Sequence, residues 1–142
     1  MNIKFAEEKD LLEVANLYRT EYSEKPYNEK WDEETTTEIV KNYFKKSKIL
    51  VAEDNQRVIG FIIFGTFQWS DGQRGHIKEI VITKEFQGQG IGTKLMKKAE
   101  EDLSKSNIKI IRLSAHIESR AINLYHKLGF KENGLVQMEK EL

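Results

Sequence analysis

The sequence feature that most restricts the fold of this chain is a turn with three glycines in five residues, within QGQGIG (87–92). A β-branched run, HIKEIVIT (76–83), precedes it, and a lysine-containing run with apolar residues at helical spacing follows it. This order predicts a strand, a glycine-rich turn and a helix. The first backbone N–H groups of a helix lack partners within the helix, and glycine lets an anion approach them without meeting a Cβ. We therefore predict that the turn binds phosphate, because a turn serving packing alone would need only one glycine.

Two familiar phosphate-binding motifs do not fit this turn. The G-x-G-x-x-G motif needs a third glycine where the chain has Thr93, and the P-loop needs Gly-Lys-Ser/Thr where the chain has Gly-Thr-Lys. A nucleotide-binding module is therefore disfavoured, and titrations with CoA and with ATP would separate the two kinds of ligand.

The rest of the chain predicts a mixed α/β (α+β) fold in one domain, residues 1–142. Apolar spacing, an N-cap at Asp32, and turns at Asn55-Gln56 and Asn133-Gly134 set the elements. The predicted order is β-αα-βββ-α-β-α-ββ, a mixed sheet with helices on its faces. The expected strands are at 2–5, 49–54, 57–67, 76–83 and 108–115. The expected helices are one at 7–22, one that starts after Asp32, one that follows the glycine turn and one at 119–129, and a hairpin is expected at the C-terminal end.

Composition excludes several classes of function. The chain has no cysteine, and its three histidines lack zinc-type spacing, so we expect neither a disulfide nor a metal site. No apolar run reaches the ~20 residues of a membrane span, and no export signal is recognisable at the N-terminus, which predicts no membrane association and a cytoplasmic protein. The formal net charge is zero, so we expect no nucleic-acid partner.

The charge is unevenly distributed along the chain. Residues 21–38 hold seven acids against two lysines, and residues 84–131 hold ten basic residues against five acids. Each run alone is typical of a solvated helix face. Together they allow a cleft with one side that favours anions and one that favours cations.

The turn resembles a signature of a known family. Gln87-Gly88-Gln89-Gly90-Ile91-Gly92 is similar to the Gln/Arg-x-x-Gly-x-Gly/Ala signature of the GCN5-related N-acetyltransferase (GNAT) superfamily. The preceding strand and the run AINLYHKLGF (121–130) resemble two further segments of that family, and the order of elements agrees over essentially the whole chain. The resemblance implies a mostly antiparallel sheet splayed between its fourth and fifth strands by a bulge. It also implies an enzyme that uses acetyl-CoA as co-substrate, with no metal and no covalent enzyme intermediate.

The resemblance also assigns the acetyl-CoA site. It implies that backbone amides in the turn hold the pyrophosphate and that the backbone of the preceding strand pairs with the pantetheine arm. Asn123 and Tyr125 would flank the thioester. The family often has asparagine where this chain has Glu118, so that contact is either missing or made by Ser119. The implied residues are Gln87 and Gly88 in the signature, the amides of Gln89, Gly90, Ile91, Gly92 and Thr93, and the strand residues Ile80, Val81 and Ile82. Lys94, Lys97 and Arg120 could meet the 3′-phosphate or be ordinary solvated side chains.

Two residues are the candidate catalytic groups. Tyr125 matches the family's general-acid tyrosine, although its helix face is also one expected to pack in the core. Glu79 is the candidate base because an acid within an apolar strand is out of place unless it faces a cleft or has a partner. An ion pair at a solvent-facing position is the alternative for Glu79. His76 and His116 are weaker candidates for the base.

The acceptor side is expected in the first two helices and their connector. Tyr27, Glu29, Trp31 and Asp32 form an acidic, aromatic-edged stretch that suits a cationic amine such as a polyamine or an amino sugar. A protein N-terminus, a lysine or another peptide amine is the alternative acceptor, and a non-catalytic acyl-CoA sensor is the alternative function. The last two strands are joined more tightly than in many relatives, and the family often forms homodimers.

Overall fold

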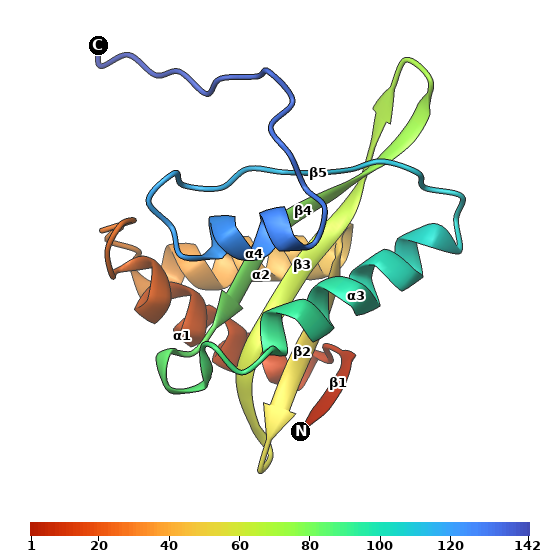
Figure 1. Cartoon of the computed structure of the whole chain (residues 1–142). Coiled ribbons are helices and arrows are strands. Elements are labelled where there is room, and N and C mark those ends of the chain that lie inside the picture. The colour runs from red at the N-terminus through yellow and green to blue at the C-terminus, as the bar shows by residue number, and fades with distance from the viewer.

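The computed structural model describes all 142 residues as a five-stranded sheet with helices on both faces. The strands lie in the order β1-β2-β3-β4-β5, and only the β4–β5 pair is parallel. The helices α1 and α2 cover one face, and α3 and α4 cover the other (Figure 1). The strands are β1 (Asn2–Phe5), β2 (Lys48–Asp54), β3 (Arg57–Trp69), β4 (Gly72–Ile82) and β5 (Ile111–Leu113). The helices are α1 (Leu11–Tyr22), α2 (Glu33–Lys46), α3 (Ile91–Ser104) and α4 (Ala121–Lys127), with 3₁₀ turns at Glu8–Asp10 and Lys84–Phe86.

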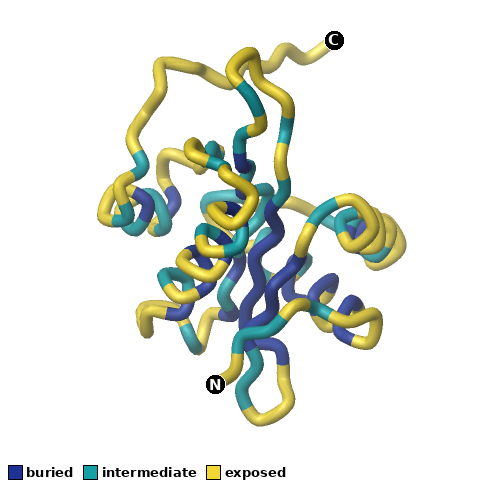
Figure 2. Tube along the Cα trace, turned by 90° about the vertical axis from the view of Figure 1, so that its right-hand side faces the viewer, coloured by how far each residue is buried: buried dark blue, intermediate teal, exposed yellow.

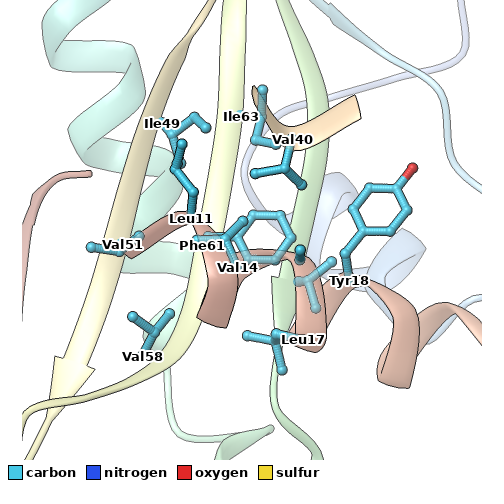
Figure 3. Packing of buried hydrophobic residues seen from close by; sticks show 12 residues of the cluster. Leu11, Val14, Leu17, Tyr18, Val40, Ile49, Val51, Val58, Phe61 and Ile63 are labelled. Atoms are coloured by element: carbon cyan, nitrogen blue, oxygen red, sulfur yellow. The ribbon is translucent and has the colours of Figure 1, made fainter. Parts of the chain in front are cut away.

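Two separate hydrophobic cores hold the layers together. Alternate residues of β2 and β3 point to opposite faces, so Phe61 and Ile63 pack under α1 and α2 while Ile62 and Phe64 pack under α3. Figure 2 shows the buried residues concentrated along the central strands. In Figure 3 the hydroxyl of Tyr18 points away from the aliphatic side chains of the first core.

Local sequence signals explain several element boundaries. The Asp32 carboxylate accepts a hydrogen bond from the Thr35 N–H (2.7 Å) and so caps α2, as the sequence predicts. Asn55 and Gln56 both have positive φ (50° and 64°), the conformation that a two-residue hairpin between β2 and β3 requires. Gly129, with φ 94°, follows the end of α4.

The sheet opens between β4 and β5, as the family resemblance implies. Only three residue pairs join these strands, the last being Ile77 with Leu113. A β-bulge lies at the same place in the pairing of β4 with β3. Phe64 pairs with Ile77 and Ile63 pairs with Glu79, so Lys78 is an extra residue on β4. The remainder of β4 therefore has one open edge.

The C-terminal hairpin predicted around Asn133-Gly134 does not form. The local turn is present, because the Asn133 side chain accepts from the Leu135 N–H (3.2 Å) and Gly134 has φ 85°. However, no strand follows α4, and Leu135 and Val136 are 70% and 79% exposed. The expected strand at 108–115 is also reduced to three residues, which leaves little edge against which a further strand could pair.

None of the helices is both long and apolar enough to cross a bilayer.

Candidate active site

The glycine turn presents unpaired backbone N–H groups at the start of α3. Gly88 and Gly90 have φ 78° and 83°, a region that residues with a Cβ rarely adopt, and Gly90 is the N-cap of α3. The first hydrogen bond of the helix is donated by the Lys94 N–H to the Gly90 carbonyl (3.1 Å). The N–H groups of residues 91–93 therefore have no acceptor within the helix, and no atom lies within 4 Å of a Cβ built on Gly90. This arrangement fits a pyrophosphate.

Side chains hold the turn in place and leave its amides free. The Gln87 side chain donates to the Ile82 carbonyl (2.9 Å) and to the Glu21 carboxylate (3.2 Å). The Gln89 side chain donates to the Glu85 carbonyl (3.4 Å). Gln87 therefore fastens the turn to the end of β4 rather than pointing toward a ligand.

The third glycine of the turn, Gly92, lies where α3 packs against α4. A Cβ on Gly92 would lie 3.2 Å from the Leu124 side chain, tighter than most contacts, so a side chain here would press the two helices apart. Leu124 immediately precedes Tyr125. The glycine at this position therefore allows α4, which carries Tyr125, to lie close to the glycine turn.

The open edge of β4 offers the backbone of alternate residues. The Thr83 N–H donates to the Ile59 carbonyl (2.8 Å), which fixes the alternation of the antiparallel ladder. The backbone groups of Ile80 and Ile82 therefore point away from β3, toward the space that β5 has left. Those of Val81 point toward β3, so of the three predicted strand residues only Ile80 and Ile82 face the edge where a pantetheine amide could pair.

The β-bulge brings Glu79 to the face covered by α1 and α2. Because the bulge inserts one residue, Lys78 and Glu79 both contact side chains on that face, whereas Ile77 and Ile80 belong to the other core. A pocket of about 400 Å³ lies here, between β4, β5, α1, α4 and the α1–α2 connector. It is lined by Tyr18, Tyr22, Tyr27, Glu29, Trp31, Ile77, Lys78, Glu79, Ile80, Leu113, Ser114, Ala115, His116, Tyr125 and Gln137.

Three tyrosine hydroxyls bind the Glu79 carboxylate. Tyr22 donates to Oε1 (2.7 Å), while Tyr43 (3.0 Å) and Tyr18 (3.2 Å) donate to Oε2. Burial raises the pKa of Glu79 above its ordinary value, and the three hydrogen bonds partly oppose that rise. Burial also raises the pKa of each of these tyrosines, so all three keep their protons and act as donors.

Tyr125, on α4, is buried and lines the same pocket as Glu79. Its ring packs edge-on against Phe130 (6.0 Å between centroids), and its hydroxyl has no hydrogen-bond partner in the protein. Burial raises the pKa of Tyr125, with smaller contributions from Tyr27 and Glu79. The Tyr125 hydroxyl therefore stays protonated near neutral pH and is free to donate its proton to a ligand.

The connector closes one side of the pocket. The Tyr27 hydroxyl donates to Ser119 Oγ (3.1 Å), which also accepts from the Ala121 N–H (3.1 Å) at the start of α4. Trp31 Nε1 donates to the Glu29 carboxylate (2.7 Å), and both residues line the pocket. Ser119 thus joins the connector to α4.

Several candidates from the sequence lie away from the pocket. The Asp32 carboxylate is occupied in capping α2, and Asn123 is exposed on α4 without a hydrogen bond. His76 packs against Phe67 outside the lining, and its pKa is lowered by burial. A hollow of about 430 Å³ between the C-terminal ends of α2 and α3 contains none of the candidate catalytic residues.

Sequence reasoning missed the tyrosines around Glu79. Tyr18, Tyr22 and Tyr43 have the helical spacing of residues that pack in a core, and that spacing alone indicates no other role for them. A signal was present, since a tyrosine hydroxyl on a buried face needs a partner and Glu79 was the only acid in the apolar strand.

Comparison with known sequences then decides the family. Residues 11–130 match the acetyltransferase (GNAT) family. The chain belongs to this family. It is an acetyl-CoA-dependent N-acetyltransferase with the GNAT fold.

Individual relatives and structures agree with that assignment. An uncharacterized N-acetyltransferase of Archaeoglobus fulgidus is 34% identical over 80% of this chain and 80% of its own length. An N-alpha-acetyltransferase of Sulfurisphaera tokodaii is 30% identical, over 67% of this chain and 62% of that protein. An L-methionine sulfoximine/L-methionine sulfone acetyltransferase of Salmonella typhimurium is 33% identical over 58% of this chain and 49% of that protein. The crystal structure of a "possible acetyltransferase" from Clostridium difficile 630 has the same fold, with a TM-score of 0.84 and 22% identity, covering 99% of this chain and 97% of that one.

The GNAT turn gives a first testable expectation. Gly90→Val forces a β-branched residue into a left-handed conformation and puts a side chain where the pyrophosphate should lie, so acetyl-CoA should bind about 10- to 100-fold more weakly. Gly72→Val is the matched control, because Gly72 also has positive φ (130°) and open space but is the first residue of β4, far along the chain from the glycine turn. Isothermal titration with acetyl-CoA measures both variants. Equal affinities for the two would show that the glycine turn does not bind the cofactor.

Proposed function

We propose that this GNAT domain transfers the acetyl group of acetyl-CoA to a primary amine by direct attack, with Glu79 as general base and Tyr125 as general acid. The observation that carries the proposal is that a carboxylate with a raised pKa and a protonated, unpartnered phenol line the same pocket. The unpaired amides of the glycine turn and the open edge of β4 support acetyl-CoA binding at the α4 side of this pocket.

The protein has two proton transfers to assist. An alkyl ammonium has a pKa of about 10.4, so an acceptor amine arrives mostly protonated and must lose a proton before it can attack. Glu79 would accept that proton, directly or through water. Acetyl-CoA supplies the acetyl group as a thioester, and the new N–C bond forms as the C–S bond breaks. Tyr125 would place its proton on the departing sulfur, and the second proton, which the nitrogen loses as the amide forms, would return the tyrosinate to its neutral form. Holding both reactants in one pocket contributes much of the rate.

The lining of the pocket supports a cationic acceptor. Tyr22, Tyr27 and Trp31 present aromatic rings, and Glu29 and Glu79 present carboxylates, to the same space. Aromatic faces and carboxylates both attract an ammonium group. A polyamine or an amino sugar is the acceptor class that we infer from this lining.

A peptide α-amine is the second candidate acceptor. A relative from Sulfurisphaera tokodaii is named an N-alpha-acetyltransferase, whereas another from Salmonella typhimurium acts by its name on small amino-acid derivatives. Some other relatives match this chain over as little as 40% of their own length, so their names do not identify its acceptor. A lysine acceptor, a non-catalytic sensor role, a homodimer and a cytoplasmic location stay predictions from the sequence.

The cationic acceptor is tested at Glu29. Glu29→Gln removes a negative charge from the pocket wall, so the KM for a polyamine or an aminoglycoside should rise several-fold, about 3- to 10-fold, while the KM for acetyl-CoA stays the same. Glu24→Gln is the control, since Glu24 is on the same connector outside the pocket lining. Unchanged KM values in both variants, or equal changes in both, would argue against binding of the ammonium at Glu29.

A further inference from the structure

We propose that Tyr43, which lies on α2 and outside the lining of the pocket, is a positioning residue for Glu79. Its hydroxyl holds the carboxylate toward the pocket, and its ring keeps the Lys78 ammonium away from that carboxylate. The inference rests on the proposed role of Glu79 as base, and it adds a residue that contacts neither substrate.

The β-bulge places Lys78 and Glu79 on the same face of the sheet, where Tyr43 keeps them from forming an ion pair. In a regular strand, neighbouring residues point to opposite faces, but the bulge turns Lys78 and Glu79 to the same face. An ammonium and a carboxylate on adjacent residues of one face would ordinarily pair. Such an ion pair would hold the carboxylate in its charged form and occupy the oxygen that should accept the proton of the substrate.

The Lys78 ammonium is instead held over the Tyr43 ring and bonded to Ser47. Its Nζ donates to Ser47 Oγ (2.7 Å) at the C-terminus of α2 and lies 5.8 Å from the centroid of the Tyr43 ring. No salt bridge joins Lys78 to Glu79. Tyr43 therefore contacts both charged groups, the cation through its ring and the carboxylate through its hydroxyl.

The hydrogen bonds leave Glu79 with one open acceptor position. A carboxylate has about four lone-pair positions, two on each oxygen. Tyr18 and Tyr43 fill those on Oε2, and Tyr22 fills one on Oε1. The remaining position on Oε1 is the only one left for an acceptor amine or a water molecule. Without Tyr43, Tyr18 and Tyr22 would still hold the carboxylate, but a second acceptor position would open on Oε2.

Besides Tyr43 and Lys78, other charged or titratable groups face Glu79, and these are the same in every comparison below. Tyr18 and Tyr22 come from α1, Glu29 from the connector and Tyr125 from α4.

Two substitutions of Tyr43 should have opposite effects on the titration of Glu79. Tyr43→Phe keeps the ring but removes one hydrogen bond to the carboxylate, so the pKa of Glu79 should rise and the acidic limb of the kcat/KM profile should move to higher pH. Activity should fall about tenfold at neutral pH and recover in alkaline buffer, with an unchanged KM for acetyl-CoA. Tyr43→Leu also removes the ring, so Lys78 can reach Glu79 and the pKa should fall. Activity should then be lost over the whole pH range and should return in Tyr43→Leu/Lys78→Met.

The titration is measured without turnover by carbon NMR of the Glu79 carboxyl in the free protein. Phe44→Leu, the neighbouring exposed residue on α2, is the control for helix stability. If Tyr43→Phe lowers activity equally at every pH and leaves the Glu79 titration unchanged, Tyr43 only packs and the proposal is wrong. The same holds if Lys78→Met fails to restore activity to Tyr43→Leu. If the pKa of Glu79 shifts as expected in the Tyr43 variants but Glu79→Gln has wild-type activity, then Glu79 is not the general base, although Tyr43 still positions its carboxylate.

Discussion

Replacing Glu79 with glutamine is expected to lower kcat/KM about a thousandfold at neutral pH while leaving the affinity for acetyl-CoA unchanged. Glutamine nearly preserves the shape of the side chain. Its oxygen can still accept from Tyr18 and Tyr43, and its NH2 group can donate to the hydroxyl oxygen of Tyr22. It cannot take a proton from an alkyl ammonium. The loss should therefore appear in the chemical step and not in cofactor binding.

The pH dependence of this variant separates a base from a merely polar residue. In the wild type, kcat/KM should rise as the pH passes the raised pKa of Glu79, since only the ionised carboxylate accepts a proton. In Glu79→Gln, activity should rise about tenfold per pH unit up to the pKa of the amine itself, because only free amine reacts. Parallel profiles for the two proteins would contradict the role of Glu79 as base.

The same substitution should not destabilise the fold. Burial makes the folded-state pKa of Glu79 higher than its unfolded value, so the folded protein binds the proton more tightly. That contribution to stability is present at acidic pH and is lost as the pH rises through the folded pKa. Above that folded-state pKa, the wild type carries a buried charge that Glu79→Gln lacks. Urea unfolding at pH 5 and pH 8 should show the variant gaining stability relative to the wild type as the pH rises.

Tyr125→Phe is expected to lower kcat about a hundredfold with little change in the KM for either substrate. This loss of kcat is at the lower end of the range for removal of a general acid, because a thiolate whose thiol has a pKa of about 8.5 leaves fairly well without protonation. Phenylalanine keeps the ring contact with Phe130, so packing should be preserved. Steady-state kinetics and a thermal melt of the same preparation check both statements.

An intact kcat in Tyr125→Phe would contradict the acid role. A fall in kcat that accompanies a large fall in melting temperature would show instead that the hydroxyl matters for folding. Because that hydroxyl has no partner in the protein, we expect the melting temperature to change little.

The elements with strong local signals were predicted correctly from the sequence. Asp32 caps α2, Asn55-Gln56 forms the β2–β3 turn, and Gly88 and Gly90 adopt positive φ at the start of α3. Each of these depends on the chemistry of one or two residues, so neighbouring sequence suffices to identify it. The buried face of α2 is less predictable: apolar spacing favours burial of Phe44, but Thr36 is buried and Phe44 is exposed, because spacing alone does not fix the rotation of a helix.

The parts that depend on long-range pairing were not predictable from the residues alone. The turn at Asn133-Gly134 forms locally, but whether strands flank it depends on an available sheet edge, and β5 is too short to offer one. The tyrosine cluster around Glu79 depends on the one-residue bulge at Lys78, which brings residues from α1, α2 and β4 together. Nothing in the spacing of HIKEIVI indicates the bulge; the family resemblance implied it.

The measurement that tests the account most directly is release of free CoA thiol from acetyl-CoA by the wild-type protein, with spermidine, an aminoglycoside and a short peptide as acceptors. The chain contains no cysteine, so a thiol reagent detects only the product. The account predicts release that depends on a cationic amine, with mass spectrometry showing one acetyl group added to that amine. Tight binding of acetyl-CoA without amine-dependent release for any acceptor would contradict it.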